Sequence, residues 1–210
     1  MRLVVTHKSL RPILRWTQRV LFAGAVSMLG YCGFVLVDTW LFQQRASHEL
    51  ERRLDDERRA RNSAPRTESP ASPEAPAAIG PDGLIGRIEI PRIGLSAVVF
   101  EGTDKNTLRH AAGHVSGTAL PGQSSNMGIA GHRDTFFRPL RNIRQDDVIT
   151  LTTLLGEYRY RVVSTKVVSP YDVAVLDPSE NEILTLVTCY PFYFVGPAPD
   201  RFIVRAERVT

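Results

Sequence analysis

The chain has 210 residues, of which 43% are apolar and 23% charged, enough for one folded domain of ordinary size with appended segments. Its net charge is +4, but the distribution of the basic residues argues against nucleic-acid binding. They gather before an apolar stretch near the N-terminus and in a mixed-charge segment after it. These patterns are typical of a membrane flank and of a solvated helix. We therefore expect no nucleic-acid partner.

The first element that the sequence predicts is a membrane-spanning helix. Residues 20–37 contain no charged side chain, and at 1.5 Å per residue they extend over roughly 27 Å, close to a bilayer core. Trp16 and Trp40 flank this stretch, as interfacial aromatic rings often do. A cleaved signal peptide is the alternative, but no small-residue cleavage site follows. We expect an uncleaved signal-anchor at residues 20–42 after a basic cytoplasmic N-terminus at residues 1–19.

The anchor has basic residues on both sides, and those nearest to it precede it. By the positive-inside rule, this arrangement favours a cytoplasmic N-terminus and places the bulk of the chain outside the cytoplasm. Residues 43–82 continue with charge pairs at helical spacing, such as Glu49 and Arg53, which predict a polar helix. Repeated prolines among alanine and serine then predict a semi-rigid linker. The folded domain is expected at residues 83–210.

In this domain, short β-branched runs alternate with glycine, proline, asparagine and aspartate, which predicts a mainly β fold. Helical periodicity is almost absent, with one short turn expected over residues 135–142. About eight strands at this spacing indicate a mostly antiparallel barrel or sandwich. The strands are expected at residues 84–90, 94–100, 109–113, 126–131, 147–155, 157–168, 183–189 and 201–208.

The chain has two cysteines, Cys32 in the apolar stretch and Cys189 at the end of an apolar strand. On the expected outer side of the membrane, Cys189 has no partner for an intramolecular disulfide. It is therefore a small core residue, one half of an intermolecular disulfide, or a nucleophile. Its position alone supports a core role and a nucleophilic role equally.

A nucleophilic cysteine needs a proton partner, and the domain offers three histidines. His132 follows a run of small residues, in a loop where its side chain can face a cleft. His114 has a similar setting, and spacing does not exclude it. His110 has no distinguishing feature, so an ordinary surface or core role is expected for it.

The same chemistry needs a donor for the oxyanion of a tetrahedral intermediate, and arginine supplies one with a permanent charge. The candidates are Arg133, Arg201 and Arg205. In the last strand, Arg201 alternates with apolar residues such as Phe202 and therefore points away from the apolar face. A solvated surface arginine is the alternative for Arg201.

Three stretches of the domain, containing His132, Cys189 and Arg201 in that order along the chain, resemble the sortases. The likeness is greatest to the class D type of membrane-anchored cysteine transpeptidase. Two earlier stretches extend the resemblance to nearly all of residues 84–210, and an N-terminal anchor followed by a spacer is also similar to the family. The five stretches are GRIEIPRIG at residues 86–94 and GTALPG at 117–122, then IAGHRDTFF at 129–137, TLVTCYPF at 185–192 and PDRFIV at 199–204.

The resemblance implies an eight-stranded β-barrel with Cys189 as nucleophile, His132 as general acid and base, and Arg201 as oxyanion or substrate clamp. His114 matches a family position that is not catalytic, and Thr188 is implied to help position the substrate. The implied reaction cleaves a Leu-Pro-x-Thr-like sorting signal through a thioester and transfers the acyl group to an amine acceptor. This acceptor is a cell-wall cross-link or a pilin lysine. No cofactor is expected.

The loop at residues 170–182 matches the family's loop over the substrate groove. Its acidic residues raise the alternative of a calcium site, but no ligand pattern is present, so we expect solvated charges and no metal. Two other functions remain open. One is an L,D-type cysteine transpeptidase acting on peptidoglycan, although its Ser-x-Gly-Cys-x-Arg-like signature is absent. The other is a non-catalytic anchored β-module whose cysteine is structural.

Overall fold

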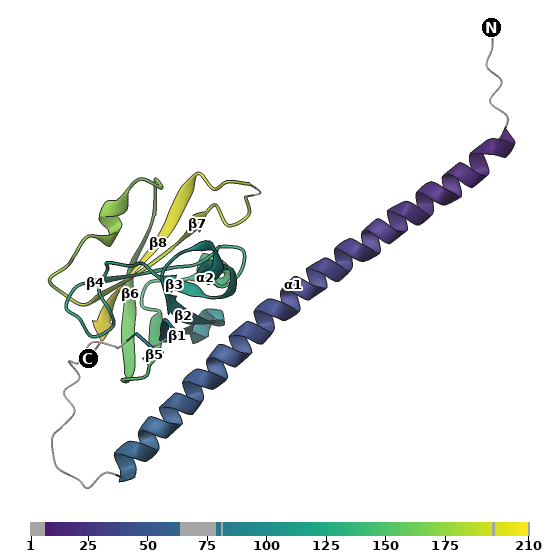
Figure 1. Ribbon diagram of the computed structural model, residues 1–210. Coiled ribbons are helices and arrows are strands. Elements are labelled where there is room, and N and C mark those ends of the chain that lie inside the picture. The colour runs from purple at the N-terminus through teal and green to yellow at the C-terminus, as the bar shows by residue number, and fades with distance from the viewer. Residues whose placement is uncertain (1–6, 64–78, 81, 195, 210) are drawn as a thin grey trace. The chain divides into compact units, whose positions relative to one another are not determined.

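The computed structural model describes residues 7–63, 79–80, 82–194 and 196–209. The chain divides into two compact units, Met1–Phe42 and Gln43–Thr210. Helix α1 (His7–Ser63) contains one segment, Leu14–Val35, that is long and apolar enough to cross a membrane. Figure 1 shows α1, in purple to blue, as one unbroken helix. It includes the predicted polar helix, whereas most of the predicted proline-rich linker lies outside the described residues.

Eight strands form a closed barrel in the order β1-β2-β3-β4-β7-β8-β6-β5, which confirms the predicted fold class (Figure 1). Neighbouring strands are antiparallel, except that β2 is parallel to β3 and β4 is parallel to β7. The strands are β1 (Leu84–Ile90), β2 (Leu95–Glu101), β3 (Ala112–His114), β4 (Asn126–Ala130), β5 (Val148–Thr153), β6 (Glu157–Val168), β7 (Ile183–Tyr190) and β8 (Asp200–Val209). The short helices are α2 (Lys105–His110), η1 (Pro91–Ile93), η2 (Arg138–Asn142) and η3 (Val173–Leu176).

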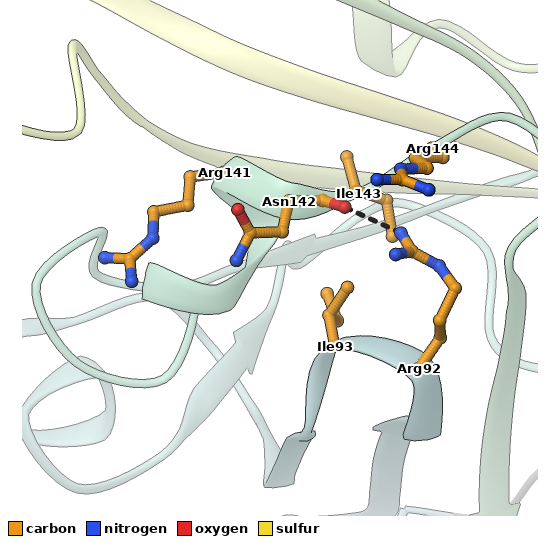
Figure 2. Close-up of a pocket in the computed structure, with 6 residues that line it drawn as sticks. All are labelled: Arg92, Ile93, Arg141, Asn142, Ile143 and Arg144. Atoms are coloured by element: carbon orange, nitrogen blue, oxygen red, sulfur yellow. Dashed lines mark hydrogen bonds between the residues drawn. The ribbon is translucent and has the colours of Figure 1, made fainter.

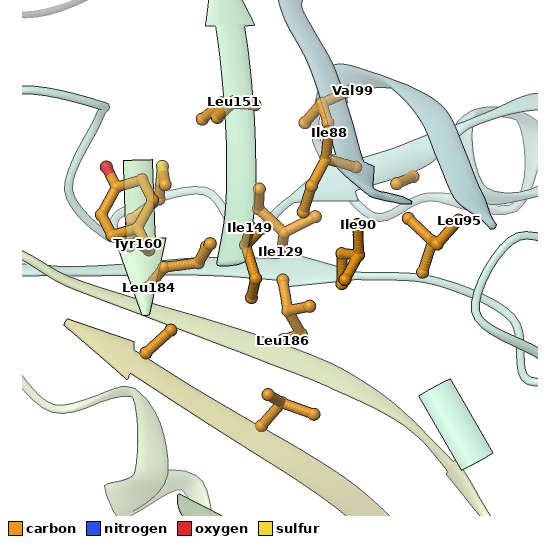
Figure 3. Packing of buried hydrophobic residues seen from close by; sticks show 14 of the residues in the cluster. Ile88, Ile90, Leu95, Val99, Ile129, Ile149, Leu151, Tyr160, Leu184 and Leu186 are labelled. Atoms are coloured by element: carbon orange, nitrogen blue, oxygen red, sulfur yellow. The ribbon is translucent and has the colours of Figure 1, made fainter. Parts of the chain in front are cut away.

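The core of the barrel comes from the inward side chains of its strands. Ile129, Ile149, Leu184 and Leu186 are each 0% exposed, and Figure 3 shows them close together among the strands. Full burial of one such side chain stabilises a fold by about 1.5–3 kcal/mol. Because successive side chains on a strand point to opposite faces, these core positions also determine which residues face outward.

One predicted strand is wrong at its start. Residues 109 and 110 end helix α2, and strand β3 begins only at Ala112. The reason is the carboxylate of Asp104, which accepts hydrogen bonds from the backbone N–H groups of Asn106 and Thr107 and so caps the helix. A helix of six residues is too short to show a helical repeat of apolar residues in the sequence.

Arg92 links the short helix η1, which follows β1, to η2 and to the residue before β5. Its guanidinium donates to the carboxylate of Asp147 and to the carbonyl oxygen of Asn142, the latter at 2.6 Å (Figure 2). The hydrogen bond from Arg92 lowers the pKa of Asp147. A group whose pKa is lower in the folded state adds stability above its unfolded pKa, and this stability is lost as the pH falls through the folded value.

We therefore expect Asp147→Asn to lower the midpoint of thermal unfolding by a few degrees at pH 7. The difference from the wild type should shrink below about pH 4, where the wild-type carboxyl group takes up a proton. The measurement is circular dichroism against temperature at several pH values. Asp146→Asn is the matched control, since the side chain of Asp146 is 72% exposed. Equal losses in both variants, or a difference that persists at low pH, would contradict the prediction.

Candidate active site

Three of the predicted site residues lie on, or directly after, the neighbouring strands β4, β7 and β8. Cys189 on β7 is the register partner of Arg201 on β8. Strand β4 ends at Ala130, which pairs with Val187 of β7, so two further residues along these parallel strands bring His132 level with Cys189. Neighbouring strands lie about 4.8 Å apart. The thiol-bearing residue therefore lies between the histidine and the arginine.

The side chains of Cys189 and Arg201 share the outer face of the barrel. Leu184 and Leu186 point into the core, so Cys189, at odd spacing from both, points outward. Residues directly opposite each other on antiparallel strands have side chains on the same face, which places Arg201 beside the thiol. Cys189 is partly exposed and His132 is exposed. A substrate can therefore reach both residues from solvent.

Within the described part of the chain, the partners of the Arg201 guanidinium are backbone carbonyl groups. It donates to the carbonyl oxygens of Asp200 at 3.0 Å and Ala198 at 3.4 Å. No ion pair of Arg201 occurs among the residues that the structure describes. A half-buried, uncompensated guanidinium beside a thiol can stabilise negative charge on a reacting carbonyl oxygen.

The other two arginine candidates lie elsewhere. Arg205 pairs with Thr185, four positions along β7 from Cys189. Arg133 is only 5% exposed, and its guanidinium donates to three backbone carbonyl oxygens, which leaves it turned away from solvent. Arg201 is therefore the one of the three candidates that the fold brings level with the thiol.

The structure also separates the two histidines that spacing left equivalent. His114 is 3% exposed, and both of its ring nitrogens are occupied inside the fold. Nδ1 lies 2.6 Å from Oε2 of Glu101, and Nε2 lies 2.9 Å from the carbonyl oxygen of Ala119. His114 thus ties β3 to β2 and to the following loop, while His132 stays accessible at the end of β4.

Thr188 is buried rather than open to a ligand. It is 2% exposed, and its hydroxyl group donates to the carbonyl oxygen of Gly131 at 2.7 Å. Gly131 also donates its N–H to Val187 at 3.1 Å, and a Cβ atom at position 131 would lie 2.8 Å from the ring of Phe137. The backbone immediately before His132 is thus fixed from several sides. A direct contact between Thr188 and substrate stays a prediction.

The loop between β6 and β7 packs against the outer face of β4 and β7. That it covers a substrate groove, as the family resemblance implies, stays a prediction. The buried side chain of Asn126 donates to the carbonyl oxygens of Val175 at 3.0 Å and Asp177 at 3.1 Å. Thr185 donates to Oδ1 of the same amide at 2.7 Å. A Cβ atom at Gly128 would lie 2.8 Å from a methyl group of Leu176, so the loop packs directly on glycine.

Sequence reasoning missed this role of Asn126, which it treated only as the first residue of a strand. A polar amide at the start of a run of small residues was the available signal, because a buried amide needs hydrogen-bond partners. Its partners lie about 50 residues away in sequence, and no local pattern indicates them. Asn126 holds the loop between β6 and β7 against β4.

Glu182, one of the acidic residues considered for calcium, has partners within the protein. Its carboxylate accepts hydrogen bonds from the Tyr160 hydroxyl group at 2.6 Å and from the Gly122 N–H at 3.1 Å, and it lies 3.5 Å from Arg208. Burial and this hydrogen bond raise the pKa of Tyr160. Among the described residues, no group of three or more His, Cys, Asp or Glu side chains could hold a metal ion.

A separate hollow of about 500 Å³ lies between η1 and η2 (Figure 2). Its lining contains Arg92, Arg141 and Arg144 but none of His132, Cys189 and Arg201. Arg92 is neutralised by Asp147, and the guanidinium of Arg141 lies 5.7 Å from the ring centre of Tyr193. This hollow is distinct from the face that carries the thiol.

Comparison with known proteins identifies the family and the fold. The family model described as "Sortase domain" matches residues 88–209. The chain belongs to the sortase family. It is 33% identical to Sortase D of Bacillus subtilis over 196 residues, which cover 90% of this chain and 96% of that protein. It is 32% identical to Sortase A of Listeria monocytogenes over 112 residues, 51% of this chain and 50% of that one.

Solved sortase structures show the same architecture. A Clostridium perfringens Sortase D5 transpeptidase superposes with a TM-score of 0.62 and 25% identity, covering 80% of this chain and 99% of that one. Sortase C-1 of Actinomyces oris gives a TM-score of 0.59 at 26% identity and covers 78% and 99%. These findings confirm the predicted class D-like resemblance. The protein is therefore a cysteine transpeptidase of the sortase type.

Proposed function

We propose that this sortase cleaves a Leu-Pro-x-Thr-like sorting signal and joins the acyl part to an amine acceptor, with Cys189 as nucleophile. The proposal is supported by the neighbouring positions of His132, Cys189 and Arg201 along β4, β7 and β8. This order suits acyl transfer because the nucleophile needs a proton partner on one side and an oxyanion donor on the other.

In the first step, the Cys189 sulfur forms a bond to the carbonyl carbon of the threonine, and Arg201 stabilises the resulting oxyanion. The carbon–nitrogen bond then breaks as His132 gives a proton to the leaving amine. In the second step, the acceptor amine attacks the thioester, and His132 removes its proton. The carbon–sulfur bond breaks and the thiolate returns. Thr188 contributes by holding Gly131, the residue before His132.

We further propose that residues 20–42 anchor the enzyme as a single pass, with the barrel outside the cytoplasm. This is supported by the apolar segment Leu14–Val35 of α1 and by the basic residues that precede the span. A membrane-impermeant thiol reagent, applied to intact cells that carry the Cys32→Ala variant, is expected to modify Cys189. Modification only after cell lysis would contradict this orientation.

The test of the reaction uses full-length protein in detergent micelles and a library of pentapeptide sorting signals. We expect an acyl-enzyme on the peptide that contains Cys189, detected by mass spectrometry, and its resolution by an added primary amine. A glycine peptide, diaminopimelate and a lysine peptide, compared as acceptors, separate a cell-wall acceptor from a pilin acceptor.

Two outcomes would contradict this proposal. Turnover of peptidoglycan stem peptides without turnover of sorting peptides would indicate an L,D-type transpeptidase. No turnover, together with a Cys189 thiol that resists alkylation in the folded protein, would indicate a non-catalytic β-module.

A further inference from the structure

Arg133 is a buried arginine, adjacent in sequence to His132. It is 5% exposed, and its guanidinium donates from Nη1 to the carbonyl oxygen of Pro191 at 2.8 Å. Nη2 donates to the carbonyl oxygens of Phe194 at 2.7 Å and Gly196 at 3.0 Å. The guanidinium also lies 5.8 Å from the centre of the Phe194 ring. A charge removed from water needs such compensation, and three carbonyl dipoles supply much of it.

These carbonyl groups belong to the loop between β7 and β8. The loop starts directly after Tyr190, the neighbour of Cys189, and ends at Asp200, the neighbour of Arg201. Among the described residues, every side-chain hydrogen bond between residues 131–137, which follow β4, and this loop comes from Arg133. Arg133 thus links the segment that carries His132 to the loop that connects the other two site residues.

We propose that Arg133 is a positioning residue of this sortase. Its guanidinium fastens the loop between β7 and β8 to the turn that carries His132, and it thereby sets the distances among His132, Cys189 and Arg201. The inference rests on the catalytic roles proposed above. It assigns to Arg133 no contact with substrate.

The chemistry explains why such a tie matters. Proton transfer needs heavy atoms about 2.6–3.2 Å apart, and a displacement of about 1 Å can reduce the rate about 100-fold. Lysine cannot replace Arg133, because an ammonium group is a compact point charge, whereas the planar guanidinium reaches several acceptors in fixed directions. In such a variant the carbonyl groups of Pro191, Phe194 and Gly196 would lose partners, and the loop would move more freely.

The experiment compares Arg133→Lys with Arg138→Lys in the full-length enzyme. Arg138 is an exposed residue of η2 and provides the matched control. For Arg133→Lys we expect kcat for a sorting peptide to fall about 10- to 100-fold, with KM within about twofold of the wild type. Amide hydrogen exchange in residues 191–199 should become faster. For the control variant, none of these values should change.

A second variant, Arg133→Gln, removes the charge and so avoids the cost of burying an ammonium group without its carbonyl partners. The same fall in kcat is expected for it, with a cooperative unfolding transition retained. A kcat within twofold of the wild type in both variants, or a loss of kcat explained entirely by unfolded protein, would overturn the proposal.

Failure of the proposed catalytic roles of His132, Cys189 and Arg201 would give a different result from failure of the Arg133 proposal. It would appear in the wild type as the absence of a Cys189 acyl-enzyme. The hydrogen-exchange comparison needs no substrate, so it would still test whether Arg133 holds the loop. Unchanged loop exchange in both Arg133 variants would itself overturn the proposal.

Discussion

Replacing Cys189 by alanine is expected to abolish cleavage of a Leu-Pro-x-Thr-like peptide, lowering kcat/KM by at least about 1,000-fold, because a methyl group cannot form the thioester. The fold should persist, since Cys189 points outward from the core and is partly exposed. The measurement is peptide cleavage by full-length protein in detergent, with mass spectrometry to detect the acyl-enzyme.

Cys32→Ala is the matched control, because Cys32 is the other cysteine of the chain and lies in helix α1. Its activity is expected to equal that of the wild type. Peptide cleavage that persists in Cys189→Ala, or an acyl group found on Cys32, would remove Cys189 from the mechanism.

Replacing Arg201 by alanine is expected to lower kcat about 100- to 1,000-fold, the usual effect of removing one well-placed oxyanion donor. The side chain is half-buried near the start of β8 and lies outside the core, so thermal stability should change little. Steady-state kinetics with the best library peptide, together with a thermal unfolding curve, provides the measurement.

Arg205→Ala is the control for Arg201, because both arginines lie on the same face of β8 but only Arg201 pairs with Cys189. This variant should keep kcat within a few-fold of the wild type. If Arg205→Ala is the damaging change and Arg201→Ala is mild, then the register of β7 and β8 does not determine the oxyanion donor.

The sequence predicted most of the barrel because strand positions are encoded locally. Alternation around Tyr160 and the apolar run before Cys189 follow from the two-residue repeat of a strand, and both regions form strands in the structure. Helix α2 was missed because a single capping residue, Asp104, determines it. Such a signal is too short to compete with a neighbouring β-like pattern.

The site was only partly accessible from sequence. Local patterns made His114 and His132 equally suitable as the proton partner and left three arginines as candidates for the oxyanion donor. Only the family resemblance distinguished among them. The structure places His114 in hydrogen bonds to Glu101 and Ala119, while Arg201 of β8 lies directly opposite Cys189 of the neighbouring strand β7. These relations join residues distant in sequence, so no local periodicity carries them.

Arg133 shows the same limit. By sequence it was one of three oxyanion candidates, since any arginine beside a candidate histidine has suitable chemistry. Its role depends on carbonyl groups about 60 residues further along the chain, which it reaches only after the barrel closes. Burial makes its donors require partners, and the loop after β7 supplies them for Nη1 and Nη2.

The sequence by itself determined that this protein has an apolar N-terminal segment, a mainly β domain and an unpaired cysteine at the end of a strand. These properties follow from hydropathy and from repeats along the chain. Tertiary structure decided that Cys189 lies between the positions of His132 and Arg201 and that Arg133 holds the adjoining loop. The physical reason is strand order, because β4, β7 and β8 become neighbours only when the barrel closes.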